Sequence, residues 1–114
     1  MPLYTITRHQ DAGPHLVTLH GKVTFGRETE RCRQKIKELV EAGEKRFVFD
    51  LTEVDYVDSA GVGFLVSCLT SLGQAGAKLR LATLPDRVRH VLRITKLNTV
   101  FEIFASREEA LRGF

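Results

Sequence analysis

Features that mark several other classes of protein are missing from this chain of 114 residues. No apolar run approaches the roughly 20 residues that a membrane-spanning helix needs. Residues 1–5 do not form a charged and then apolar signal segment. The two cysteines, Cys32 and Cys68, lie far apart on apolar helical patterns, which predicts buried free thiols. We therefore expect a single cytoplasmic domain over residues 1–114, without membrane insertion.

Motifs for catalysis and cofactor binding are also missing. Val57 stands two positions before Ser59, where a nucleophile elbow has glycine. Gly61 and Gly63 are not followed by the third glycine of a dinucleotide-binding loop, and no Gly-Lys-Ser/Thr phosphate loop occurs. The histidines show no metal-ligand spacing with one another or with the cysteines; they are His9, His15, His20 and His90. The sequence thus predicts no enzyme, no cofactor and no metal.

Two polar residues interrupt apolar strand patterns. His20 shares a strand face with Leu16 and Thr18, so we expect a hydrogen-bonded strand histidine. Asp50 lies near the end of an apolar strand, where receiver domains carry their phosphorylated aspartate. Those domains also need an acidic pair after the first strand, and only Asp11 is available there. We therefore expect a hydrogen-bonding or solubility role for Asp50.

The basic residues do not indicate nucleic-acid binding. The net charge is a mild +3, and most Lys and Arg residues are mixed with Asp and Glu. The tighter group is Arg87, Arg89, His90 and Arg93, with no aromatic residue for stacking on bases. We expect no direct nucleic-acid partner.

The order of periodic patterns predicts an α/β fold. The expected elements are strands at 3–8 and 15–20, a helix from Phe25 to a cap at Gly43, a strand at 47–51, a helix at 59–72, a strand at 78–82, a helix from Pro85, an edge strand at 99–104, and a short helix opened by a capping box at 106–109. A turn at 11–14 makes the first two strands a hairpin, and Gly21 ends the second. Strand–helix–strand units give parallel strands. The expected fold is thus a mixed, mostly parallel sheet with about four helices.

The stretch Asp55–Gly63 joins the central strand to the second helix. Asp58 is suited to cap that helix, which leaves the hydroxyl of Ser59 facing outward. The first N–H groups of a helix have no internal partner, and the helix dipole there favours anions. Gly61 and Gly63 add no bulk, so we expect a partner to approach Ser59 closely.

Residues 47–51, with Val54 and the segment 57–65, closely resemble the signature of the STAS domain, which sulfate transporters and anti-sigma factor antagonists share. Residues 19–23 resemble the family's strand end before the first helix. Residues 92–104 and 110–111 resemble its C-terminal pattern. The resemblance runs from about Leu3 to Leu111, and the chain is most similar in size to the free-standing anti-sigma factor antagonists.

That resemblance implies a phosphorylation switch at Ser59. In the family, an anti-sigma factor that is itself an ATP-dependent serine kinase phosphorylates this serine. The unphosphorylated antagonist binds the anti-sigma factor and releases the sigma factor, and a metal-dependent PP2C-type phosphatase reverses the modification. The implied partner-binding residues are Asp58, Ser59, Ala60, Gly61, Val62, Gly63, Lys22 and Thr24.

Two positions depart from the family pattern. Ala60 replaces a second hydroxyl residue, which leaves Ser59 as the acceptor, and Thr24 stands where many members carry an aspartate. The alternative is a STAS binding module that is never phosphorylated, such as a soluble subunit of a lipid-transport ATPase complex. A ligand-binding or enzymatic α/β domain is a third possibility. The Asp58–Ser59 pair favours the switch, while the partner, the stimulus and the oligomeric state stay open.

Overall fold

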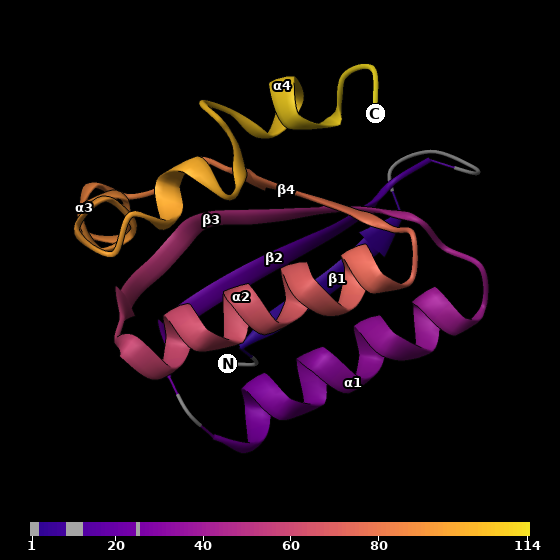
Figure 1. Cartoon of the computed structure of the whole chain (residues 1–114), viewed down its shortest axis with the longest axis horizontal. Coiled ribbons are helices and arrows are strands. Elements are labelled where there is room, and N and C mark those ends of the chain that lie inside the picture. Colours follow the sequence, from indigo (N-terminus) through magenta and orange to yellow (C-terminus); the bar gives the residue numbers. More distant parts are fainter. Residues whose placement is uncertain (1–2, 9–12, 25) are drawn as a thin grey trace.

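The computed structural model describes residues 3–8, 13–24 and 26–114. Its centre is a five-stranded sheet in which the strands lie in chain order (Figure 1). The edge strand β1 (Tyr4–Arg8) is antiparallel to β2 (His15–Val23). The next three strands continue parallel to β2; they are β3 (Arg46–Val57), β4 (Lys78–Ala82) and β5 (Glu102–Phe104). The mixed, mostly parallel sheet predicted from the sequence is confirmed.

Helices cover the sheet on both faces. The helices α1 (Arg27–Glu41) and α2 (Ser59–Gln74) lie side by side across one face (Figure 1). The short helix α4 (Arg107–Leu111) packs against β3, β4 and β5. Between β4 and β5 the chain forms α3 (Asp86–Ile94) and the single 3-10 turn η1 (Leu97–Thr99). The described residues thus form four α-helices, and the expectation of about four is confirmed.

Alternation along β2 and β3 divides the core between the two faces. Val17 and Phe49 belong to the main core beneath α1 and α2, whereas Leu16 and Val48 pack with Ala110 of α4. Successive strand residues point to opposite faces, so each of these two strands contributes apolar side chains to both layers of the core. Because β2 and β3 are packed on both faces, the ends of these two strands, which carry the candidate site, are held in place by the core.

The cysteines lie within this core, as the sequence predicts. Cys32 of α1 and Cys68 of α2 are free thiols and fully buried. Burial raises the pKa of both thiols, that of Cys68 to about 12. Thiolates are the reactive form of cysteine, so these residues act as small apolar side chains.

Several boundaries differ from the sequence-based prediction. Gly21 does not end β2: it has a φ of 71°, next to a shift of register, and the strand continues to Val23. A glycine in this conformation accommodates a bulge inside a strand. The strand β3 extends beyond Leu51 to Val57, and α2 passes through Gly73 before it ends at Gln74.

The chain near residue 99 also differs from the prediction, because η1 occupies residues 97–99 and the strand begins only at Glu102. Parts of other predictions lie outside the described residues: His9, the Asp11–Ala12 half of the hairpin turn, and Phe25 at the start of the first helical pattern.

Candidate functional site

The candidate site lies where β2 and β3 end side by side. Lys22 pairs with Tyr56, and Val23 pairs with Val57 in the parallel register. The residues that follow, Thr24 and Asp58, therefore leave the sheet at the same edge. Carboxyl ends of parallel strands are the usual location of sites in open α/β sheets.

Asp58 is the N-cap of α2, as the sequence predicts. Its backbone is extended, with φ −106° and ψ −173°, and its carboxylate accepts a hydrogen bond from the Gly61 N–H at 2.8 Å. The Val62 N–H donates to the Asp58 carbonyl at 2.9 Å and begins the helical ladder. The carboxylate thus satisfies one of the N–H groups that every helix start leaves without an internal acceptor.

Ser59 is the first residue of α2 and is exposed to solvent. Its hydroxyl is not needed to cap the helix, because Asp58 already has that role. Ala60, next in the chain, is also exposed. The expected arrangement, a capped helix with an accessible serine at its start, is confirmed.

The two glycines after Ser59 have different roles. An ideal Cβ on Gly61 would lie 1.9 Å from the carbonyl oxygen of Val23, so a side chain there would collide with β2. A Cβ on Gly63 would meet no atom within 4 Å. The expectation that both glycines leave space for a partner is therefore wrong for Gly61, which is buried against β2. Gly63 is exposed on the surface of α2.

The eight residues expected to bind a partner are brought to one edge but are not equally accessible. Ser59, Ala60, Gly63 and Lys22 are exposed. Thr24 and Asp58 are half-buried, while Gly61 and Val62 are buried below them. The surface that a partner can contact is thus smaller than the sequence motif.

Tyr56 extends this surface and was not singled out in the sequence. Its side chain is 40% exposed, and the residue pairs with Lys22 two positions before Asp58. Alternation counted back from buried Val57 places Tyr56 on the opposite, outward face, although the count from Val54 gives the reverse. Exposed tyrosines are common at protein interfaces.

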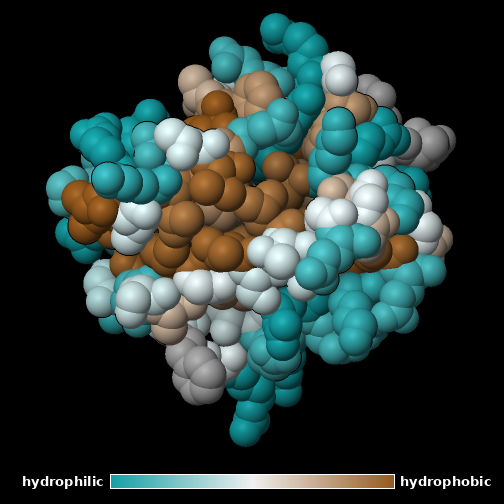
Figure 2. All heavy atoms as spheres, viewed as in Figure 1, coloured by the Kyte–Doolittle hydropathy of each residue, from teal (hydrophilic) through white to brown (hydrophobic). Residues whose placement is uncertain are grey.

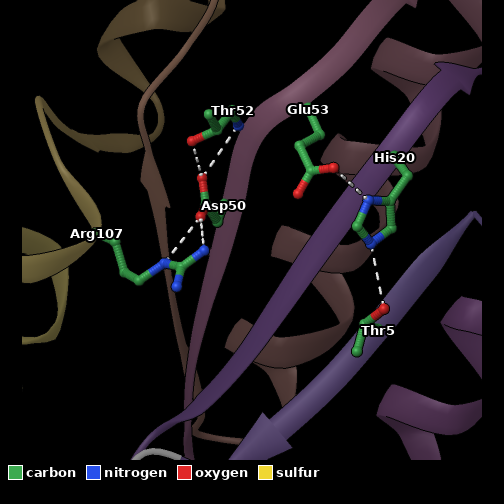
Figure 3. A network of polar contacts seen from close by, with 6 residues as sticks. All are labelled: Thr5, His20, Asp50, Thr52, Glu53 and Arg107. Atoms are coloured by element: carbon green, nitrogen blue, oxygen red, sulfur yellow. Dashed lines mark hydrogen bonds and ion pairs between the residues drawn. The ribbon is translucent and has the colours of Figure 1, made fainter.

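Asp50 lies elsewhere, under α4. Figure 3 shows Asp50 and Thr52 of β3 facing Arg107 of α4. The carboxylate is 1% exposed and accepts hydrogen bonds from the Thr52 N–H at 3.0 Å and from the Thr52 hydroxyl at 2.6 Å. The Arg107 Nε and Nη2 donate at 2.9 and 2.6 Å. The hydrogen-bonding role is confirmed, whereas a solubility role is excluded by burial.

Opposing effects act on the Asp50 carboxyl. Burial raises its pKa, but the hydrogen bonds from Thr52 and the Arg107 guanidinium outweigh burial and hold the pKa below its ordinary value. The residue is therefore a charged anchor for α4.

His20 is a hydrogen-bonded strand histidine, as expected. Its Nε2 lies 3.1 Å from the Thr5 hydroxyl of β1, and its Nδ1 lies 3.2 Å from the Glu53 carboxylate of β3 (Figure 3). These contacts join the three strands β1, β2 and β3 across one face of the sheet.

In the described part of the chain, no group of three or more His, Cys, Asp and Glu side chains is arranged to hold a metal ion. Over the same residues, none of the helices combines the length and apolar character required to cross a membrane.

Comparison with known proteins identifies the family. The family model of the STAS domain matches residues 5–110. BtrV of Bordetella bronchiseptica, whose name gives it as a candidate anti-sigma factor antagonist, is 30% identical over 109 residues, covering 96% of this chain and 93% of that protein. The anti-sigma-B factor antagonist of Listeria monocytogenes is 38% identical over 73 residues, covering 60% of this chain and 64% of that protein.

The fold is also found among solved structures. The anti-sigma factor antagonist SpoIIAA in its unphosphorylated form superposes with a TM-score of 0.78 at 19% identity, covering 94% of this chain and 91% of that chain. The phosphorylated form of SpoIIAA from Bacillus gives a TM-score of 0.74 at 18% identity, covering 94% and 95%. Since the family model of the STAS domain matches nearly the whole chain, this protein belongs to the STAS domain family.

Proposed function

We propose that this chain is an anti-sigma factor antagonist that is switched by phosphorylation of Ser59. The observation that carries the proposal is the exposed Ser59 directly after the Asp58 cap, at the first residue of α2. The relatives BtrV and the Listeria protein are named as antagonists of anti-sigma factors, and SpoIIAA has been solved with and without phosphate. In this proposal, unphosphorylated chain binds an anti-sigma factor and thereby releases a sigma factor.

The partner that binds is also the enzyme that modifies. The anti-sigma factor is a serine kinase that uses ATP, and a PP2C-type phosphatase removes the phosphate. The accessible surface around Ser59 contains Ala60, Gly63, Lys22 and Tyr56, so the hydroxyl is open to a kinase active site. Ala60 has no hydroxyl, which leaves Ser59 as the acceptor in this motif.

Electrostatics explain why one phosphate is sufficient. Phosphorylation adds about 1.5 to 2 negative charges at pH 7. The Asp58 carboxylate is the next residue and is fixed by its hydrogen bond to Gly61. At a separation of about 5 Å, repulsion between a doubly charged phosphate and a carboxylate is roughly 2 kcal/mol in water and several-fold larger when a partner excludes the water. A loss of 1.4 kcal/mol is already tenfold in affinity.

The test uses purified chain, ATP and each serine-kinase anti-sigma factor of the same organism. We expect mass spectrometry to locate one added phosphate on Ser59. The Ser59→Ala variant should remain unmodified and keep its binding, and Ser59→Asp should bind at least tenfold more weakly. Thr70→Ala, which removes another exposed hydroxyl of α2, should behave like the unmodified protein.

The switch would be excluded if no kinase phosphorylated Ser59 and if the Ser59→Asp variant bound its anti-sigma factor as tightly as the unmodified protein. Co-purification with a transport ATPase in that case would identify the chain as a STAS module that is never phosphorylated.

A further inference from the structure

The positive charge of this protein is concentrated in one segment, which contains α3 and the η1 turn packed against it. Residues 85–100 contain four Lys and Arg against one acidic residue, a net charge of +3. The rest of the chain contains thirteen basic and thirteen acidic residues and is therefore neutral. The whole net charge of +3 thus comes from the α3–η1 segment.

The basic side chains of this segment are not neutralised by the protein itself. Four of them are exposed and form no ion pair with any other described residue; they are Arg87, Arg89, Arg93 and Lys96. The acidic residue, Asp86, lies in the first turn of α3, where a negative charge stabilises a helix. The cations are therefore available to an anionic partner.

Two aliphatic side chains are exposed in the same segment. Ile94, at the end of α3, is 64% exposed, and Val100, directly after η1, is 53% exposed. The described part of the chain has one other exposed large apolar side chain, Tyr56 at the candidate site. Figure 2 shows apolar side chains open to solvent among hydrophilic ones where Figure 1 places α3, and more of them in the hollow next to it. Exposed apolar surface with a polar rim is typical of interaction sites.

Cationic and apolar side chains share the outer face of α3. Arg87, His90 and Ile94 follow one another at steps of three and four residues, so they lie on one face of the helix. At 1.5 Å per residue, this face is about 10 Å long from Arg87 to Ile94. The opposite face is fixed by the buried side chains of Val88 and Leu92. One extended surface can therefore contact the cations and Ile94 together.

An anionic lipid surface matches both kinds of side chain. Lipid phosphates pair with arginine, and aliphatic side chains enter the boundary between headgroups and acyl chains. A nucleic acid would pair with the same cations, but it offers no apolar layer for Ile94, and residues 85–100 contain no aromatic side chain to stack on bases. The cleft that Val100 lines between α2, β4 and β5 does not select a charged peptide, because its charged residues, Lys78 and Glu102, have opposite signs.

We propose that α3 binds the surface of membranes that contain anionic lipids. Arg87 and Arg93 contact lipid phosphates, and the Ile94 side chain between them enters the boundary between headgroups and acyl chains. Each basic residue near an anionic surface strengthens binding about fivefold, so the binding is reversible and weakens with salt. The proposal goes beyond the proposed function and does not require phosphorylation of Ser59.

The experiment measures sedimentation of the purified chain with vesicles of equal parts phosphatidylglycerol and phosphatidylcholine, and with vesicles of phosphatidylcholine alone. We expect binding to the anionic vesicles at low salt and much weaker binding to the neutral ones. The double variant Arg87→Gln/Arg93→Gln should bind about 25-fold more weakly at low salt. Ile94→Ser should bind several-fold more weakly at every salt concentration, because salt does not screen its apolar contact. The matched control, Lys35→Gln/Lys37→Gln, removes two exposed cations from α1 and should change binding far less.

Circular dichroism should show that every variant is folded, since the substituted side chains are exposed. The proposal is overturned if the chain does not sediment with anionic vesicles at low salt, or if the α1 variant loses as much binding as the α3 variant. It is also overturned if Ile94→Ser binds vesicles like the unmodified protein while a single-stranded oligonucleotide binds the same cations, which would assign α3 to nucleic acid. None of these results bears on the switch at Ser59, which is tested with kinase and ATP in the absence of lipid.

Discussion

The carbonyl oxygen of Val23 occupies the space where residue 61 would otherwise carry a side chain. An ideal Cβ on Gly61 would lie 1.9 Å from that oxygen and 2.8 Å from the carbonyl carbon. The last residue of β2 and the first turn of α2 are therefore in backbone contact. This contact holds the end of β2, with Lys22 and Thr24, beside the helix start that carries Ser59.

The Gly61→Ala variant should accordingly be less stable. The added methyl group can be accommodated only if α2 moves away from β2, because a carbonyl oxygen of a central strand cannot rotate aside. We expect a loss of about 1–3 kcal/mol in the free energy of unfolding, typical of overpacking. Urea denaturation followed by circular dichroism measures it.

Gly63→Ala is the matched control, since it makes the same change two residues later in open space. That variant should be more stable by about 0.4–1 kcal/mol, because alanine reduces the freedom of the unfolded chain. Equal stability of the two variants would show that the close approach of Val23 is not maintained in solution.

The Arg107→Met variant tests the anchor of α4. Asp50 is 1% exposed, and the Arg107 side chain, 45% exposed, supplies two of its four hydrogen bonds. Removing the guanidinium leaves a buried carboxylate with Thr52 as its remaining partner. We expect a loss of about 1.5–3 kcal/mol in the free energy of unfolding, as for hydrogen bonds to charged groups. Arg112→Met, on the exposed residue after α4, should change stability little.

The ion pair between Asp50 and Arg107 also predicts how stability responds to acid. The Asp50 pKa in the folded protein is below the ordinary value of 3.8, so the unfolded chain binds the proton first as the pH falls. The stabilisation is complete above that value and is lost as the pH falls through the lowered pKa. Without Arg107 the pKa of Asp50 in the folded protein rises, so in Arg107→Met this acid-induced loss should be smaller. Identical acid titrations of the two proteins would contradict the prediction.

Periodic patterns made most of the fold predictable, whereas contacts between distant residues did not. The alternation of β2, the stripe of α1 and the capping role of Asp58 are local features, and the structure contains them all. The extension of β3 was missed because only Val54 and Val57 are buried after Leu51, and the residues in between, which include Glu53 and Asp55, are exposed. The contact of Gly61 with Val23 and the ion pair of Asp50 with Arg107 join residues far apart in sequence. Neither leaves a periodic signal.

His15 should make stability depend on pH near neutrality. The ring is buried and stacks on Phe47, with centroids 5.7 Å apart, and its Nδ1 lies 3.3 Å from the Glu44 carboxylate, which Arg8 also contacts. Burial lowers the pKa of His15 below its ordinary value of 6.5, although Glu44 opposes this. The unfolded chain therefore binds the proton first, so the free energy of unfolding should decrease as the pH falls below 6.5.

Urea denaturation between pH 5 and 7.5 measures this dependence. His15→Phe keeps the stacking on Phe47 and should reduce the slope, whereas His90→Gln removes an exposed histidine as the control. A slope that survives in His15→Phe would assign the dependence to other groups.

The thiols should not react in the folded protein. Cys32 and Cys68 are fully buried, and burial raises the pKa of both, so almost no thiolate is present at pH 8. We expect Ellman's reagent to modify neither thiol at once under native conditions and both after unfolding in guanidinium. Rapid reaction of one thiol per chain with the reagent in the native protein would show that α1 and α2 separate locally.

Substitutions at Asp58 should separate its two roles, the helix cap and the negative charge beside Ser59. Asparagine caps a helix about as well as aspartate, while alanine at an N-cap costs about 1 kcal/mol. Asp58→Asn should therefore unfold at nearly the same urea concentration as the unmodified protein, and Asp58→Ala at a lower one. Asp58→Asn also removes the carboxylate that is repelled by the phosphate, so phosphorylation of Ser59 should weaken binding of the anti-sigma factor less in this variant. Calorimetry with phosphorylated and unphosphorylated protein measures the ratio, and an unchanged ratio would mean that the phosphate acts on the partner alone.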